Sequence, residues 1–188
     1  MKKTILLIFF IPALLYGQAQ VHKPFQPSAV FNDSLTSIVI DFRNNFYQVQ
    51  GEELMPQEGM EVYQSAISLP GATHCVIYRF HSTIDTTASW QAILYQGESY
   101  ADALKIYRNT YTQLTKSKMK WSDNRLTAFK GDMEEPDENI RFTNTLLQLN
   151  VPDFLYRHFY AAIEITNSYN GWEVHLNLHN KKDDKDRY

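Results

Sequence analysis

The sequence predicts an α+β fold in which meanders of antiparallel strands carry helices on one face. Two stretches, residues 63–95 and 140–179, alternate apolar and polar residues with the period of two that a half-buried strand needs. Turn-forming sequences divide each stretch into short successive strands, as a meander requires. A segment with apolar residues at helical spacing precedes each stretch. The resulting order, α-βββ and then α-β(β)ββ, predicts one α+β domain and suggests a duplicated α-βββ unit.

The first 19 residues have the features of a secretory signal peptide. A basic start is followed by an apolar run over residues 5–15 and by small residues before position 20. The run is too short to span a bilayer, and Pro12 within it does not suit a stable transmembrane helix. No cysteine lies near the predicted cleavage site. We therefore expect a Sec-type signal peptide over residues 1–19, no lipoprotein anchor, no membrane insertion after its removal, and a secreted or periplasmic protein.

The composition of the full chain limits what the protein can be. Of its 188 residues, 44% are hydrophobic and 14% are aromatic, so packing can stabilise a domain without disulfides. The single cysteine, Cys75, has no partner for an intramolecular disulfide. The formal charge is −3 and becomes −5 once Lys2 and Lys3 are removed with the signal peptide. This negative charge argues against a nucleic-acid partner.

The first predicted helix follows an extended leader, residues 20–31, which contains two prolines. Asn32, Asp33 and Ser34 are the predicted capping side chains of this helix. Its apolar residues recur at helical spacing and are predicted to pack against the sheet. They are Leu35, Ile38, Val39, Phe42, Phe46 and Val49.

The second predicted helix begins at Ser99, with Asp102 completing a start that resembles a capping box. The predicted domain covers residues 32–180, and a duplication would divide it into halves at 32–97 and 98–180. The charged residues 181–188 are predicted to form a disordered tail.

Turn signals set the limits of the predicted strands. Residues 51–59 are predicted to form a polar loop, and Pro70 with Gly71 favours a type II turn. Asn170-Gly171 is the strongest short hairpin signal in the chain. The segment 154–165 fits both a helical and a strand period. We predict a strand because its last residues lead directly into the Asn170-Gly171 turn, and a helix is the alternative.

The candidates for catalysis lie on the polar side of the last two predicted strands. Glu164 and His158 share one face of the first of these strands, and His175 lies on the polar face of the second. A carboxylate beside an imidazole can act as an acid–base pair in a covered cleft. On an open face the same residues form the ordinary polar side of an antiparallel sheet, and this second interpretation is preferred.

His175 and His179 are the candidates for metal binding because they share one face of the last predicted strand. No third ligand follows at a fixed spacing, so no metal site is predicted. His74 precedes Cys75, but neighbouring residues in a strand point to opposite faces. These two residues are therefore not expected to form a nucleophile–base pair.

Three tyrosines are the candidates for a ligand-binding surface: Tyr78, Tyr95 and Tyr160. Each lies in a predicted strand and alternates with other apolar residues. Aromatic rings in such positions either pack in the core or line a recognition surface.

No motif supports a specific chemistry. The chain has no phosphate-cradling glycine loop, no Gly-x-Ser-x-Gly elbow, no CxxC pair and no His-Glu-x-x-His, and no cofactor is expected. The preferred hypothesis is an exported, soluble, non-catalytic binding module whose partner is a protein or glycan of the cell envelope. The alternative is a small enzyme or ligand carrier with a pocket on the Glu/His polar sheet face. A third hypothesis is a purely structural part of an envelope assembly.

Overall fold

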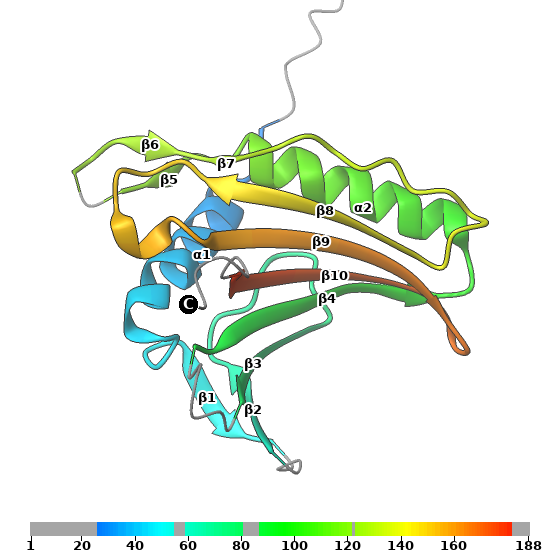
Figure 1. Cartoon of the computed structure of the whole chain (residues 1–188), viewed down its shortest axis with the longest axis horizontal. Helices are drawn as coiled ribbons and strands as arrows, with labels where there is room; N and C mark the ends of the chain where they lie inside the picture. The colour runs from blue at the N-terminus through cyan, green and yellow to red at the C-terminus, as the bar shows by residue number, and fades with distance from the viewer. Residues whose placement is uncertain (1–25, 55–58, 81–86, 122, 182–188) are drawn as a thin grey trace, which may run out of the picture.

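The computed structural model describes residues 26–54, 59–80, 87–121 and 123–181. Within these residues, eight antiparallel strands form one curved sheet, and helices α1 (Ala29–Asp41) and α2 (Tyr100–Thr115) pack on one side of it (Figure 1). The predicted α+β class with antiparallel meanders is thus confirmed. The predicted signal peptide, residues 1–19, and residues 182–188 of the predicted tail lie outside the described residues.

The sheet joins two runs of consecutive strands. Each run of four strands follows the chain order, and the last strands of the two runs pair with each other in the middle of the sheet. Such an order agrees with a two-part chain, although the duplication itself stays a prediction. From one edge to the other, the strands are β1 (Gln50–Glu53), β2 (Met60–Ser65), β3 (His74–Phe80), β4 (Ser89–Gly97), β10 (Gly171–Asn180), β9 (Phe159–Ser168), β8 (Phe142–Leu149) and β7 (Phe129–Lys130).

Four short elements lie outside this sheet. Strands β5 (Met119–Lys120) and β6 (Leu126–Thr127) form a separate two-stranded ribbon. The 3₁₀ turn η1 (Phe42–Asn44) extends α1, and η2 (Phe154–Tyr156) precedes β9.

The starts of the two helices test the predicted caps. Ser28 caps α1, because its Oγ accepts a hydrogen bond of 3.1 Å from the Phe31 amide. The predicted cap at residues 32–34 is therefore wrong, and the end of the predicted leader is helical. Ser99 caps α2 as predicted, because its Oγ accepts a hydrogen bond of 3.2 Å from the Asp102 amide.

Two further predictions concern strands. Residues 159–168 form a strand, and the turn at Asn170-Gly171 connects it to β10 as a hairpin. The strand interpretation of this segment is confirmed, whereas residues 154–156 form the turn η2. The predicted polar loop at 51–59 is partly wrong because β1 covers Gln50–Glu53. Three of the four β1 residues are exposed, so the strand lacks the alternation by which the others are predicted.

The core lies between the sheet and the two helices. Trp90 of β4 is fully buried there, and its Nε1 donates a hydrogen bond of 2.9 Å to Ser65 Oγ of β2. Tyr156 of η2 is also fully buried, and its hydroxyl donates to the carbonyl oxygens of Val39 and Ile40 at the end of α1. These bonds satisfy polar groups that burial would otherwise leave unpaired.

Candidate functional site

The side of the sheet opposite the helices carries polar side chains, and we call it the open face. Since side chains alternate along a strand, each strand that supplies apolar residues to the core supplies its alternate residues to this face. Along β10, for example, the residues that face the core are buried and the alternate residues are half-buried. The central residues of the open face are Tyr78, Gln91, Ile93, Tyr160, Ala162, Glu164, His175, Asn177 and His179.

A chain of two hydrogen bonds joins three neighbouring strands on the open face. Tyr78 Oη of β3 donates to Gln91 Oε1 of β4 at 3.2 Å, and Gln91 Nε2 donates to Asn177 Oδ1 of β10 at 2.7 Å. Glu164 of β9 lies beside Asn177, and the Asn177 side chain favours the ionised form of its carboxyl. The chain fixes the orientation of both amides. Each amide nitrogen still carries a second hydrogen that the chain does not use.

This chain of hydrogen bonds borders a cavity of about 590 Å³, a volume within the range of small-molecule sites. Its polar side groups come from the centre of the open face, and apolar side chains from β2 and β3 complete it. One of these, Phe80, is 52% exposed. The lining residues are Met60, Tyr78, Phe80, Thr87, Ala88, Ser89, Gln91, Glu164, Asn177, His179 and Asn180.

Burial shifts the pKa of two groups in this cavity. It raises the pKa of the Glu164 carboxyl, although the Asn177 side chain and the nearby His175 act in the opposite direction. It lowers the pKa of the His179 imidazole, and the positive charge of Lys181 adds to this effect. Both shifts favour the uncharged form of the side chain.

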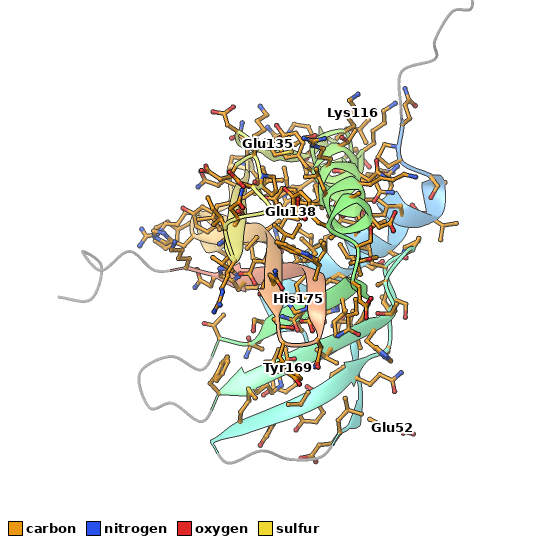
Figure 2. The ribbon with its side chains drawn as sticks, turned by 90° about the vertical axis from the view of Figure 1, so that its right-hand side faces the viewer. Glu52, Lys116, Glu135, Glu138, Tyr169 and His175 are labelled. Atoms are coloured by element: carbon orange, nitrogen blue, oxygen red, sulfur yellow. The ribbon has the colours of Figure 1, made fainter. Side chains whose placement is uncertain are left out.

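Two of the three candidates for catalysis, Glu164 and His175, are cross-strand neighbours, whereas His158 lies apart from them. His175 lies opposite Glu164 in the β9–β10 register, but its Nε2 lies 3.2 Å from Glu173 Oε2 on its own strand. His158 lies in the turn that precedes β9, six residues before Glu164. Only Glu164 of the three lines the cavity. Figure 2 shows His175 within the sheet, near the β9–β10 hairpin.

The two candidates for metal binding, His175 and His179, lie four residues apart on β10, with Asn177 between them on the same face. Their cross-strand neighbours on β9 are Glu164 for His175 and Tyr160 for His179. In the part of the chain that the structure describes, no group of three or more His, Cys, Asp or Glu side chains is placed to hold a metal ion.

The three candidate tyrosines are divided between the two faces. Tyr78 lines the cavity, and Tyr160 pairs with His179 on the open face. Tyr95 instead packs against the core, and its hydroxyl accepts a hydrogen bond of 3.3 Å from the Ser99 amide. The cause is a bulge in β4: Ile93 pairs with His175 and Tyr95 pairs with Val174, so one extra residue interrupts the alternation.

The structure separates His74 from Cys75 in the predicted way. The Cys75 thiol faces the core, and burial raises its pKa. His74 is exposed on the next position of β3, so the two side chains do not form a catalytic pair.

Gln91 and Asn177 are the site residues that sequence reasoning did not single out. The period of two places both on polar strand faces, which is a signal shared by many exposed residues. They are 86 residues apart, and only the pairing of β4 with β10 brings them together. The sequence contains no local signal for that pairing.

Two further findings bear on function. Among the described residues, no helix has the length and apolar character needed to cross a membrane. No protein-family model, no curated protein and no solved structure matches the chain.

Proposed function

We propose that the protein is a non-catalytic binding protein that takes a hydroxyl-rich ligand of the saccharide class in the cavity of the open face. The observation that carries this proposal is the chain of hydrogen bonds from Tyr78 through Gln91 to Asn177 along the cavity, which Glu164 also lines. Saccharide hydroxyl groups both donate and accept hydrogen bonds, and the cavity offers them oriented amide donors and a carboxylate acceptor.

The apolar part of the cavity supports the same ligand class. A sugar ring has an apolar side as well as hydroxyl groups, and aromatic faces suit such a ring. Phe80 and Tyr78 of β3 supply these faces beside the polar groups. Because hydrogen bonds already fix the polar side chains, a ligand loses less free energy in ordering them.

The experiment is a calorimetric titration of the protein with a panel of soluble oligosaccharides. The Gln91→Ala change removes an amide from the centre of the site and is expected to weaken binding about tenfold, the effect of one or two hydrogen bonds. Gln96→Ala is the matched control, because Gln96 lies on the same strand but outside the cavity. Failure of the whole panel to bind, or equal loss in both variants, would contradict the proposal.

We also propose that the protein acts outside the cytoplasm, with a glycan of the cell envelope as its partner. The pattern of a basic start, an apolar run over residues 5–15 and small residues before position 20 supports export. The measurement is the intact mass of the protein from fractionated cells. A mass that lacks residues 1–19 in the periplasmic or secreted fraction is expected, whereas a full-length cytoplasmic protein would contradict export.

One observation favours an enzyme or ligand carrier as the second candidate. Glu164 lines the cavity with a raised pKa, and His175 lies opposite it on β10. A raised pKa brings a carboxyl closer to the range in which it can act as a general acid. Product analysis after long incubation with each bound oligosaccharide separates the two functions: turnover that Glu164→Gln abolishes without loss of binding would establish catalysis.

A further inference from the structure

A second cavity, of about 480 Å³, lies at the β7 edge of the sheet. Two of its lining residues, Lys130 and Arg157, are cations, and no lining residue is a carboxylate. Among the described residues, neither cation forms an ion pair. We call this space the edge cavity. Its lining residues are Lys130, Gly131, Gln148, Leu149, Asn150, Val151 and Arg157.

Neighbouring groups hold Arg157 in place. Gln148 Nε2 donates a hydrogen bond of 2.9 Å to the Arg157 carbonyl oxygen, which ties the start of β9 to β8. The guanidinium carbon lies 4.2 Å from the centre of the Phe154 ring, a cation–π distance. An anion that binds here therefore meets a cation with reduced freedom, which lowers the entropic cost of binding.

The backbone at Gly131 places Lys130 beside β8. Gly131 has a φ of +153°, and a Cβ atom at this position would lie 2.8 Å from the Leu146 carbonyl oxygen. The close approach therefore requires glycine. This close approach keeps β7 paired with β8, and Lys130 of β7 is the cross-strand partner of Gln148.

The edge cavity and the cavity of the open face lie along one row of cross-strand neighbours. Lys130 pairs with Gln148, Gln148 with Tyr160, and Tyr160 with His179, which lines the open-face cavity. The two ends of this row are three strand spacings apart, and at about 4.8 Å per spacing this is a distance of about 14 Å. Half-buried Tyr160 lies between the two cavities, where its ring offers a stacking surface.

We propose that the edge cavity binds the acidic group of the ligand that the open-face cavity holds, so that the ligand is an acidic oligosaccharide bearing a carboxylate or sulfate. This inference rests on the proposed function. Arg157 suits such a group because a planar guanidinium can bind two of its oxygens at once. Glu164 at the other end repels the same group when ionised, so charge fixes the direction in which the ligand lies.

The test is a glycan array that carries neutral and acidic oligosaccharides, probed with the wild type and with the double variant Lys130→Gln/Arg157→Gln. Acidic glycans are expected to dominate the wild-type signal, and their affinity is expected to fall about tenfold or more in the double variant. Lys105→Gln/Lys116→Gln is the matched control, because it removes the same charge from two exposed positions, Lys105 in α2 and Lys116 at its C-terminal cap, on the other side of the sheet. Figure 2 shows Lys116 at this end of α2.

Three outcomes would overturn this inference. They are binding of neutral glycans only, binding of acidic glycans that survives the double variant, and an equal loss of affinity in the control.

A second measurement tests the anion site separately from the proposed function. Inorganic sulfate is titrated into the labelled protein, and the Gly131 and Asn150 amide signals are followed by NMR.

Saturable shifts that the double variant lacks are expected from an anion site. If sulfate binds in this way but no glycan does, the saccharide proposal fails and the anion site stands. If neutral glycans bind through Gln91 and sulfate gives no saturable shift, the proposed function stands and the edge cavity is not an anion site.

Discussion

The two faces of the sheet use the same strands in different ways. On the core face, Trp90 and Leu176 are fully buried and make apolar contacts beneath the helices. On the open face, their strand neighbours Gln91 and Asn177 are half-buried and hydrogen-bond each other. One alternating pattern therefore separates stability from recognition: the core face supplies buried apolar area, and the open face supplies oriented polar groups beside a cavity.

The difference matters because half-buried polar groups cost stability unless they are paired. The chain from Tyr78 to Asn177 pairs the amides of Gln91 and Asn177, which offsets the cost of burying them. Asn144 Oδ1 and Asn180 Oδ1 have no hydrogen-bond partner among the described residues, so the open face as a whole contributes little stability. Most of the folding free energy should then come from the core face. Single substitutions at neighbouring positions can test this division.

The largest expected effect comes from a pair of neighbours on β10. Leu176→Ala removes a fully buried side chain and is expected to lower the free energy of unfolding by about 3 kcal/mol, within the range for such cavities. Asn177→Ala, one residue further on the open face, should cost only about 1 kcal/mol. Urea denaturation of both variants measures the difference.

Saccharide binding should show the opposite order in this pair. Leu176→Ala is expected to keep its affinity under conditions where it remains folded, whereas Asn177→Ala should weaken binding because the amide lines the cavity. Equal losses of stability in the two variants would contradict the division between the faces.

The second effect, of intermediate size, concerns neighbours on β8. Thr145 is 1% exposed on the core face, where its hydroxyl lies 2.6 Å from Tyr107 Oη and accepts from the Glu134 amide at 2.8 Å. Thr145→Val keeps the shape but leaves the Glu134 amide without this acceptor, so a loss of about 1–2 kcal/mol is expected in thermal or urea unfolding.

Asn144→Ala is the control for this substitution. Asn144 lies on the open face, and its Oδ1 has no hydrogen-bond partner among the described residues. We expect it to change the free energy of unfolding by less than about 0.5 kcal/mol. A larger loss than in Thr145→Val would show that the open face contributes to stability as much as the core does.

The sequence predicts the faces better than it predicts the site. Local signals were sufficient for the Asn170-Gly171 hairpin, the Ser99 cap and the alternation along β10, because each depends on residues close in the chain. They also placed Glu164 and Tyr78 on polar or undecided faces, where the structure puts them beside the cavity.

The remaining features depend on contacts between distant segments. Pairing of β4 with β10 joins Gln91 to Asn177, and a bulge turns Tyr95 towards the core. Neither feature can be recognised from the local sequence pattern, because a bulge is defined by the partner strand as well as by its own residues. The alternation predicts that Glu164 and His158 share one strand face, but β9 begins only at Phe159, and His158 lies in the preceding turn.

The smallest expected effect is the pH dependence of two groups in the open-face cavity. Burial raises the folded-state pKa of Glu164 above its ordinary value of 4.5. Its contribution to stability is therefore present below pH 4.5 and is lost as the pH rises through the raised pKa. Burial lowers the folded-state pKa of His179 below 6.5, so its contribution is present above pH 6.5 and is lost as the pH falls through the lowered pKa.

The two contributions thus change in opposite directions, which a pH series of urea unfolding curves can resolve. Glu164→Gln is expected to remove the loss of stability that follows a rise in pH above 4.5. His179→Gln is expected to remove the loss that follows a fall in pH below 6.5, and each variant serves as the control for the other. Both changes should be small because these side chains are only half-buried and retain some hydration. If neither substitution alters the profile, both side chains are fully hydrated in solution, and the open face lacks the partial burial on which its cavity depends.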